Sequence, residues 1–438
     1  MSQLSARDLG LFGLVAVLIL GTGIFQGVNT ALVLLNMGLV SAIMSLGVNL
    51  QWGFAGLFNI GVMGFVALGG LAAVLIGMPP TTEAIAAGGG GMAIAMTLGA
   101  ATIVAAIVAY RHLAAGLTRN LAVLGIVVVG FLVYRTFFDP ARDAIEAVNP
   151  AGTGYLGGFG LEGAGMILAW PAGGLIAAGA AWVIGKTALG LRSDYLAIAT
   201  LGIAEIIIAI LKAEDWLSRG VKNVVGIPRP VSYEVDLQAD PAFAERADAF
   251  GLDIVAASTL QVRLEWTILF TIVLVLILVL AQLALNSPWG RMMRAIRDNE
   301  TAAEAMGKDV TARHLQIFVL GSAILGMAGA MMTTLDSQLT PSAYQPLRFT
   351  FLIWVMVIVG GSGNNFGAVL GGFIIWFLWV QVEVGAAFIM EVITAPLPDG
   401  SALETHLLAG APHMRLLTMG LVLLLMLRFF PRGLIPER

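Results

Sequence analysis

The feature that most constrains this chain is a series of apolar stretches long enough to cross a lipid bilayer. About 20 apolar residues span the hydrocarbon core as a helix, and backbone polar groups in lipid must find partners within the chain. Along the 438 residues, twelve such stretches are expected, at 9–25, 29–50, 57–77, 92–110, 120–137, 168–185, 194–213, 266–286, 314–334, 348–360, 366–387 and 414–430. The predicted fold is an all-α, polytopic transmembrane helix bundle of about 10–12 spans in one domain, 1–438.

Composition supports a membrane protein and excludes several kinds of site. Only 11% of the residues are charged, against about 25% in soluble domains. The absence of cysteine excludes disulfides and thiolate chemistry. The histidines lack the spacing of metal ligands, so we expect no catalytic or metal site; they are His112, His314, His406 and His413. The net charge of −4 does not suggest a nucleic-acid partner.

Two regions depart from a regular bundle. The stretch 348–360 is short and ends at the glycine-rich turn 360–363, so it is expected to be a broken or re-entrant helix. The segment 214–265 is charged and contains three prolines, which predicts a structured external loop that could contact a partner. The first stretch, 9–25, has no small-residue cleavage site after it and is interpreted as a retained span.

The distribution of basic residues predicts the orientation. Cytoplasmic loops are rich in Lys and Arg. Alternating crossings place on one side Arg111, Arg119, Lys186, Arg192, Arg291, Arg294, Arg297, Lys308, Arg313, Arg432 and Arg438. The other side receives 138–167, 214–265 and 388–413; the last of these holds Glu391, Asp399 and Glu404 but no Lys or Arg. Both termini are therefore expected in the cytoplasm of a multi-pass inner (plasma) membrane protein.

The cytoplasmic segment 287–313 is the most informative stretch. Ser287 and Pro288 suit the start of one short helix, and Asn299 can cap a second. Gly307 stands where a helix end favours positive φ, and Thr311 can cap the following span. Small alanines on a short surface helix suit docking into a groove of another protein. The alternative is an ordinary charged loop that anchors helix ends.

Five stretches give the chain a resemblance to a known family. They are RAIRDNETAAEAMG at 294–307, LRSDYLAIATLGIAEI at 191–206, GVNLQWGFAGLFNIGVMGFVALGG at 47–70, VGGSGNNFGAVLG at 359–371 and FPRGLIP at 430–436. Together they resemble the high-affinity branched-chain amino-acid ABC permeases, the "M" subunit of that bacterial importer family. Two departures leave the solute open: 218–226 reads SRGVKNVVG in place of T-G-G-P-N-G-I, and 79–166 looks like an insertion of about two spans.

The resemblance implies a permease subunit of an ATP-driven importer for amino acids, branched-chain or otherwise apolar. It implies a second, homologous permease chain, two cytoplasmic ATPase subunits that hold ATP and Mg, and a periplasmic solute-binding protein. This chain itself would hold no cofactor and would not be an enzyme. The segment 287–307 would sit in a groove on one ATPase, with coupling residues Arg291, Arg294, Ala295, Asp298, Glu300, Ala302, Ala303 and Gly307.

Polar residues inside the spans are candidates for the substrate pathway. Glu205 lies within an apolar span, where a carboxylate costs several kcal/mol unless it is paired or hydrated. It is therefore expected to face a partner chain or a wet pathway, or else to pair with a neighbouring helix. Asn49 and Asn59 are weaker candidates of the same kind, as are Asn36 and Glu383, because polar side chains often simply join helices.

Two other functions remain open. Importers of urea or short amides have similar permeases. An ion-coupled secondary transporter would be self-sufficient, but such proteins show inverted repeats, and no convincing repeat occurs in this sequence.

Overall fold

The computed structural model describes residues 5–149, 152, 154–398 and 401–437, so that Asp399 and Arg438 lie outside it. Within these ranges, nine helical segments are long and apolar enough to cross a membrane. They are α1 (Ala6–Gln26), α2–η1 (Val28–Gly53), α4–η2–α5 (Thr82–His112), α6 (Leu117–Ala147), η3–α7 (Gly163–Ala188), α8 (Ser193–Ala213), α12 (Ile254–Asn286), α15 (Val310–Asp336) and α17 (Asn365–Thr394).

Three further apolar segments complete the bundle. Two are shorter helices, α3 (Val62–Gly77) and η6–α16 (Leu347–Gly360). The third is a pair bent by 51°, α18 (Ala402–Gly410) and α19 (Met414–Phe429), joined by η7 (Ala411–His413). Each of the twelve predicted stretches overlaps a helix, which confirms the all-α membrane fold.

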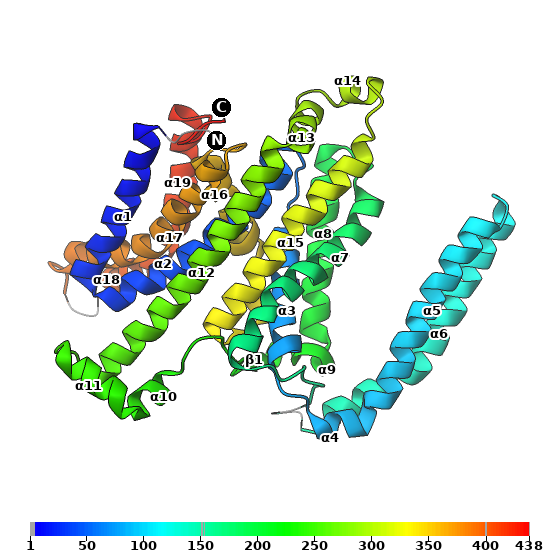
Figure 1. Ribbon diagram of the computed structural model, residues 1–438, viewed down its shortest axis with the longest axis horizontal. Coiled ribbons are helices and arrows are strands. Elements are labelled where there is room, and N and C mark those ends of the chain that lie inside the picture. Colours follow the sequence, from blue (N-terminus) through cyan, green and yellow to red (C-terminus); the bar gives the residue numbers. More distant parts are fainter. Residues whose placement is uncertain (1–4, 150–151, 153, 399–400, 438) are drawn as a thin grey trace.

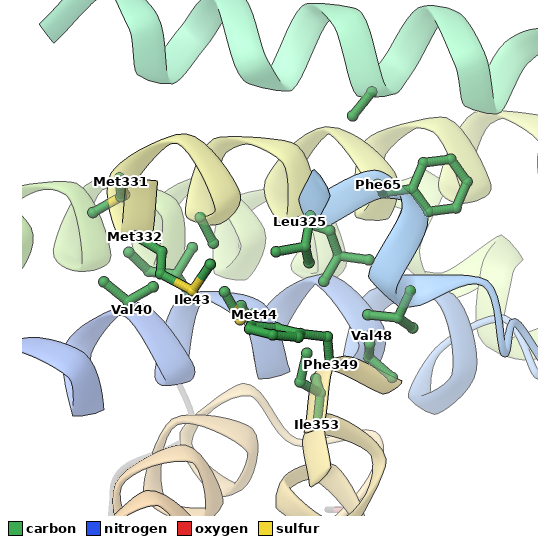
Figure 2. Close-up of a cluster of buried hydrophobic side chains, with 14 of the residues drawn as sticks. Val40, Ile43, Met44, Val48, Phe65, Leu325, Met331, Met332, Phe349 and Ile353 are labelled. Atoms are coloured by element: carbon green, nitrogen blue, oxygen red, sulfur yellow. The ribbon is translucent and has the colours of Figure 1, made fainter. Parts of the chain in front are cut away.

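The core of the bundle forms where α2, α3, α15 and η6–α16 meet. Figure 2 shows this packing: Val40 and Ile43 of α2 lie against Leu325 and Met332 of α15, and Phe349 closes the cluster from η6. Ile43 and Leu325 are fully buried. Because lipid tails are as apolar as these side chains, close packing rather than escape from water must hold such helices together.

Glycines bring the helix backbones of the core into contact. A Cβ atom on Gly69 of α3 would lie 1.9 Å from the carbonyl oxygen of Gly326 in α15. Any side chain at position 69 would therefore force α3 and α15 apart. The high glycine content of the sequence is used in this way for close helix packing.

The stretch 348–360 is a short helix with a π-helical first part, and its re-entrant character stays a prediction. The helix ends at Gly361, whose φ is +120°. The C-terminal segment then docks on it: the Leu434 amide donates to the Val359 carbonyl and the Ile435 amide to the Gly360 carbonyl, both at 2.9 Å. The chain reaches η6 through η5 (Pro341–Ala343) and a two-stranded pairing of β1 (Val224–Val225) with β2 (Gln338–Leu339).

The segment 214–265 is structured, as predicted, but the external loop is shorter than predicted because α12 already begins at Ile254. It contains α9 (Asp215–Ser218), η4 (Gly220–Lys222), α10 (Glu234–Ala239) and α11 (Pro241–Ala249). Asp253 accepts a hydrogen bond of 3.0 Å from the Val255 amide and caps α12, which therefore begins at Ile254 instead of near residue 266.

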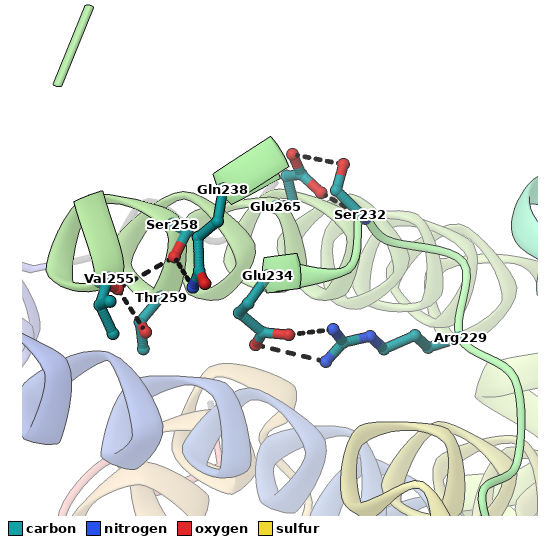
Figure 3. A network of polar contacts seen from close by, with 8 residues as sticks. All are labelled: Arg229, Ser232, Glu234, Gln238, Val255, Ser258, Thr259 and Glu265. Carbon is teal, nitrogen blue, oxygen red and sulfur yellow. Dashed lines mark hydrogen bonds and ion pairs between the residues drawn. The ribbon is translucent and has the colours of Figure 1, made fainter. Parts of the chain in front are cut away.

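Polar contacts hold these external helices onto α12 (Figure 3). Arg229 pairs with Glu234, the Ser232 amide donates to Glu265 at 2.9 Å, and Gln238 donates to Ser258 at 2.9 Å. Ser258 and Glu265 lie about two turns apart on α12, whereas the Arg229–Glu234 pair joins two parts of the external segment itself. Together these contacts make the external segment a firm extension of the bundle.

The two ends of the bundle differ in what they carry. Figure 1 shows α13 (Pro288–Asp298) and α14 (Glu300–Ala305) at the same end of the bundle as the start of α1 and the end of α19, whereas α4, α9, α10 and α11 lie at the opposite end. We call the first the coupling end and the second the external end. The predicted arrangement of loops agrees with this geometry. Which end faces the cytoplasm stays a prediction.

The helices α5 and α6 pack mainly on each other. Figure 1 shows this hairpin standing apart from the other spans. At the external end it contacts α9, where the Trp216 amide donates to Glu146 at 3.3 Å and the rings of Phe138 and Trp216 meet at 6.0 Å. The hairpin supplies the two additional spans expected within 79–166.

Candidate functional site

The segment between α12 and α15 folds as the two short helices that the sequence predicted. The Ser287 hydroxyl accepts from the Trp289 amide at 3.2 Å and caps α13, and Asn299 accepts from the Ala302 amide at 3.0 Å and caps α14. Gly307 ends α14 with φ +76°. One cap differs: Asp309, not Thr311, caps α15, because its carboxylate accepts from the Ala312 amide at 2.9 Å. That span begins at Val310.

One face of α13 is buried against the bundle and the opposite face is open. Met293 and Ile296 are buried. Six of the eight predicted coupling residues are exposed and two are half-buried. The exposed ones are Arg291, Ala295, Asp298, Glu300, Ala302 and Gly307; the half-buried ones are Arg294 and Ala303. The structure thus brings these residues together on one outward surface, which we call the coupling surface.

Arg297 fixes α13 to the coupling end of the bundle. Its guanidinium donates to the Gly53 carbonyl and to Glu437, with an Nη1–Oε2 distance of 2.9 Å, and it also pairs with Asp298 at 3.0 Å. Burial alone would lower the pKa of Arg297, but the hydrogen bonds that it donates to Glu437 and Asp298 outweigh burial and raise the pKa. Arg297 therefore ties three distant parts of the chain together.

Two residues of this region were missed as functional by the sequence interpretation. Arg297 was counted only as a basic loop residue, because nothing in the sequence placed Gly53 and Glu437 beside it. Met306 follows α14 and is 79% exposed at the tip of the segment. A flexible apolar side chain held out in this way suits a groove on another protein. The sequence offered one indication of this role, because Met306 directly precedes Gly307, the glycine expected to end the second short helix.

Asn49 and Asn59 lie in a buried polar network. The side-chain Nδ2 of Asn49 donates to Oδ1 of Asn365 at 3.0 Å, and Oδ1 of Asn49 accepts from the backbone amide of Gly363 at 2.9 Å. Asn59 donates to Gln51 at 2.8 Å, and Gln51 donates to Ser322 of α15 at 3.0 Å. The network joins η1, α15 and the turn after α16. This arrangement suits helix joining, and a role in the substrate pathway stays a prediction.

Glu205 lies on the outside of the bundle. Its side chain is exposed on α8, and it forms no hydrogen bond or ion pair with any other residue that the structure describes. It stands 12 residues after the start of α8, which corresponds to about 18 Å along the helix and so to the middle of a bilayer. A carboxylate there requires a partner or water.

An apolar pocket lies one turn of α8 away from Glu205. It has a volume of about 490 Å³ and is lined by residues of the η1–α3 loop, α8, η6–α16 and α19. Among them are Phe58, Ile60, Leu201, Leu347, Trp354 and Leu423. The pocket is open rather than enclosed, and its walls suit an aliphatic group.

Metal binding has no support in the part of the chain that is described. No group of three His, Asp or Glu side chains there lies close enough to share an ion.

Comparison with known proteins places the chain in a family. A family model described as "Branched-chain amino acid transport system / permease component" matches residues 144–427. The match begins at the end of α6, so α5 and nearly all of α6 lie outside it. No solved structure matches the chain.

Individual relatives carry related names. The probable branched-chain amino acid transport permease protein LivM of Methanocaldococcus jannaschii is 26% identical over 312 residues, 70% of this chain and 76% of the relative. The high-affinity branched-chain amino acid transport system permease protein LivM of Escherichia coli is 25% identical over 269 residues, 61% of this chain and 56% of the relative. The probable permease protein LivH of M. jannaschii is 32% identical over 111 residues, 25% of this chain and 34% of that protein.

Proposed function

Since the chain belongs to the family of permease components of branched-chain amino acid transport systems, we propose that it forms half of the membrane pore of an ATP-driven amino-acid importer. It is a multi-pass inner-membrane protein. Two ATPase subunits at the coupling end would power the importer, and a solute-binding protein would deliver the amino acid at the external end. ATP would be hydrolysed only in the partner subunits.

This proposal rests on two properties of the α13–α14 segment. The coupling surface faces outward, and α13 is firmly attached to the bundle. The coupling surface is open to a partner, whereas Met293, Ile296 and the Arg297 contacts fix α13, which carries part of that surface, to the bundle. A loop that only linked two spans would not need both properties. A movement of the ATPase would therefore be transmitted to α2, η1 and the C-terminal segment rather than lost in a flexible connection.

The second permease would pack on the side of the bundle that presents Glu205. The match to LivH as well as to LivM supports two related permease chains in one importer. An exposed carboxylate at mid-membrane depth is tolerated where another chain or a wet pathway covers it. The apolar pocket beside Leu201 favours a solute with an aliphatic side chain over urea or a short amide.

The proposal is tested first by reconstitution. The purified chain alone should neither hydrolyse ATP nor take up solute, whereas the complete complex should take up a branched-chain amino acid when ATP is supplied. Uptake by the chain alone, driven by an ion gradient, would show that it is a secondary transporter.

A double variant tests the role of α14. Glu300→Arg reverses a charge on the coupling surface, and Gly307→Pro forces φ negative where the structure has +76°. We expect ATP hydrolysis to be uncoupled from uptake while the amount of protein in the membrane is unchanged. Normal uptake by this variant would count against docking through α14.

A further inference from the structure

Arg348 is a charged residue far from either end of the bundle. It lies in η6 (Leu347–Phe351), a π-helical segment, and such segments are frequent at functional sites. It stands 12 residues before Gly360, which lies at the coupling end. At about 1.5 Å per residue, Arg348 is roughly 18 Å into the bundle, near the middle of a hydrocarbon core of about 30 Å.

The guanidinium of Arg348 has no acceptor in the described part of the chain. It makes no hydrogen bond or ion pair there, and its Nε atom is buried without a partner. It lies instead near two aromatic rings, 5.1 Å from Phe349 and 5.9 Å from Trp376. The indole Nε1 of Trp376 is also buried without an acceptor. Two kinds of unused donor therefore lie side by side.

No neighbouring carboxylate contacts the Arg348 guanidinium directly. Arg415 of α19 is close enough to repel it, and the carboxylate of Glu383 is already paired with Arg415. Asp336, at the external end of α15, attracts Arg348 but forms no ion pair with it among the described residues. Although the cluster holds two acidic and two basic side chains, the donors of Arg348 therefore remain without an acceptor.

Three of the residues around Arg348 are arranged along one face of a single helix. Trp376, Trp379 and Glu383 follow one face of α17 at intervals of three and four residues. The Arg415 guanidinium lies 4.7 Å from the Trp379 ring. Arg415 stands 14 residues before the end of α19, about 21 Å along the helix, so it shares the depth of Arg348.

An unpaired guanidinium in a membrane is costly and calls for an anion. Arginine presents a fork of donors that matches a carboxylate with two parallel hydrogen bonds. We propose that Arg348, assisted by the indole N–H of Trp376, binds the carboxylate of the amino acid during its passage through the pore. This inference rests on the proposed importer function and specifies the group of the solute that the pore recognises.

The depth of Arg348 favours a solute over a lipid as the source of the anion. Lipid phosphates lie at the membrane surfaces, about 15 Å from the centre of the hydrocarbon core. A free amino acid brings its carboxylate to any depth that the pathway reaches. The other partner to consider is an acidic side chain of the second permease. A measurement of the thermal stability of the complex distinguishes this partner from the carboxylate of the solute.

The test uses the complete complex with its binding protein, reconstituted with ATP and radiolabelled leucine. Arg348→Gln should lower uptake at saturating binding protein at least ten-fold while binding-protein-stimulated ATP hydrolysis stays within two-fold. Arg348→Lys keeps the positive charge but loses the two parallel donors, so its uptake should lie between that of wild type and that of Arg348→Gln. The matched control is Arg428→Gln, an exposed arginine near the end of α19. It should leave uptake unchanged.

Stability measurements keep the proposal open to contradiction. Because Arg348→Gln removes an unpaired charge, the thermal midpoint of the complex should not fall. A lower midpoint, or loss of the second permease on purification, would show that a protein carboxylate pairs with Arg348 and would overturn the proposal. Dependence of wild-type uptake on anionic lipid that disappears in Arg348→Gln would identify a lipid phosphate instead.

Failure of this inference can be told apart from failure of the importer proposal. Equal uptake by wild type and Arg348→Gln overturns the role of Arg348 alone. A complete complex that takes up no amino acid overturns the proposed function and this inference with it.

Discussion

Two helix pairs leave the core of this protein, and they differ in how they are attached. The pair α13–α14 is short and polar, and its first helix, α13, is fixed to the bundle by buried Met293 and Ile296 and by Arg297. The pair α5–α6 is long and apolar, yet only 6% of the most apolar part of α6 is buried, against 83% in α2. Its main attachment is at Trp216.

The difference indicates which pair can transmit force. A helix pair with several rigid contacts moves the bundle when a partner moves it. A hairpin attached at one end can tilt in the lipid without disturbing the core. We therefore expect changes at α13–α14 to affect transport strongly and changes in α5–α6 to affect it little.

The largest effect is expected from Arg297→Ala. It removes charged hydrogen bonds to Gly53 and Glu437, each of which contributes about 1.5–3 kcal/mol. Since about 1.4 kcal/mol corresponds to a factor of ten, uptake by the reconstituted complex should fall at least ten-fold. Lys308→Ala, an exposed cation of the same segment, is the control. Equal losses in both would mean that only surface charge matters.

A smaller but clear effect is expected from Met306→Asp. Placing a charge on an apolar anchor should weaken ATPase binding by about ten-fold, or about 1.4 kcal/mol, which is less than the roughly 2 kcal/mol or more of a central hot spot. Co-purification of the ATPase at graded salt concentrations measures this. Met306→Leu should behave like wild type. If aspartate is tolerated, this tip does not enter a groove.

Deletion of most of the hairpin, residues 85–145, with a short Gly-Ser link should change uptake less than two-fold. The Thr81 amide bonds to the Leu156 carbonyl at 3.0 Å, so the chain on either side of the deletion is already held together. Uptake of labelled leucine by the complex measures the effect. Loss of uptake comparable to that of Arg297→Ala would remove the distinction between the two pairs.

The smallest effect is expected at the external end as the pH falls. Burial raises the pKa of Glu234, but hydrogen bonds and charge from Arg229 outweigh it and lower the pKa below the usual 4.5. This pairing stabilises the folded state above pH 4.5 and is lost as the pH falls through the lowered value. Limited proteolysis of α10–α11 should therefore increase at acidic pH. Glu234→Gln should be cleaved equally at neutral and acidic pH.

The sequence predicted the parts of the fold that depend on local chemistry. Apolar length located the spans, and Ser287, Asn299 and Gly307 marked the ends of α13 and α14. The start of α12 was wrong because hydropathy falls before residue 266 although the helix, capped by Asp253, continues outward to Ile254. Contacts between distant residues, such as Arg297 with Glu437, left no local pattern.

Arg348 shows why the middle of the bundle was harder to predict. At the border of a short apolar stretch it resembled a residue at a membrane surface. The shortness of that stretch was the available signal, because a helix of this length cannot bring both of its ends to the surfaces. Asn49 and Asn59 were predicted either to line the pathway or to join helices, and the structure places both in a buried polar network; a role in the pathway stays a prediction.

The central claim is that α13–α14 is held by an ATPase on the cytoplasmic side. The chain contains no cysteine, so a single cysteine can be placed at Ala302 on the coupling surface or, for comparison, at Ala244 in α11. Only Ala302→Cys should cross-link to the ATPase, and a membrane-impermeant thiol reagent applied to spheroplasts should label only Ala244→Cys. Labelling of Ala302→Cys from outside, or no cross-link in an active complex, would contradict the account.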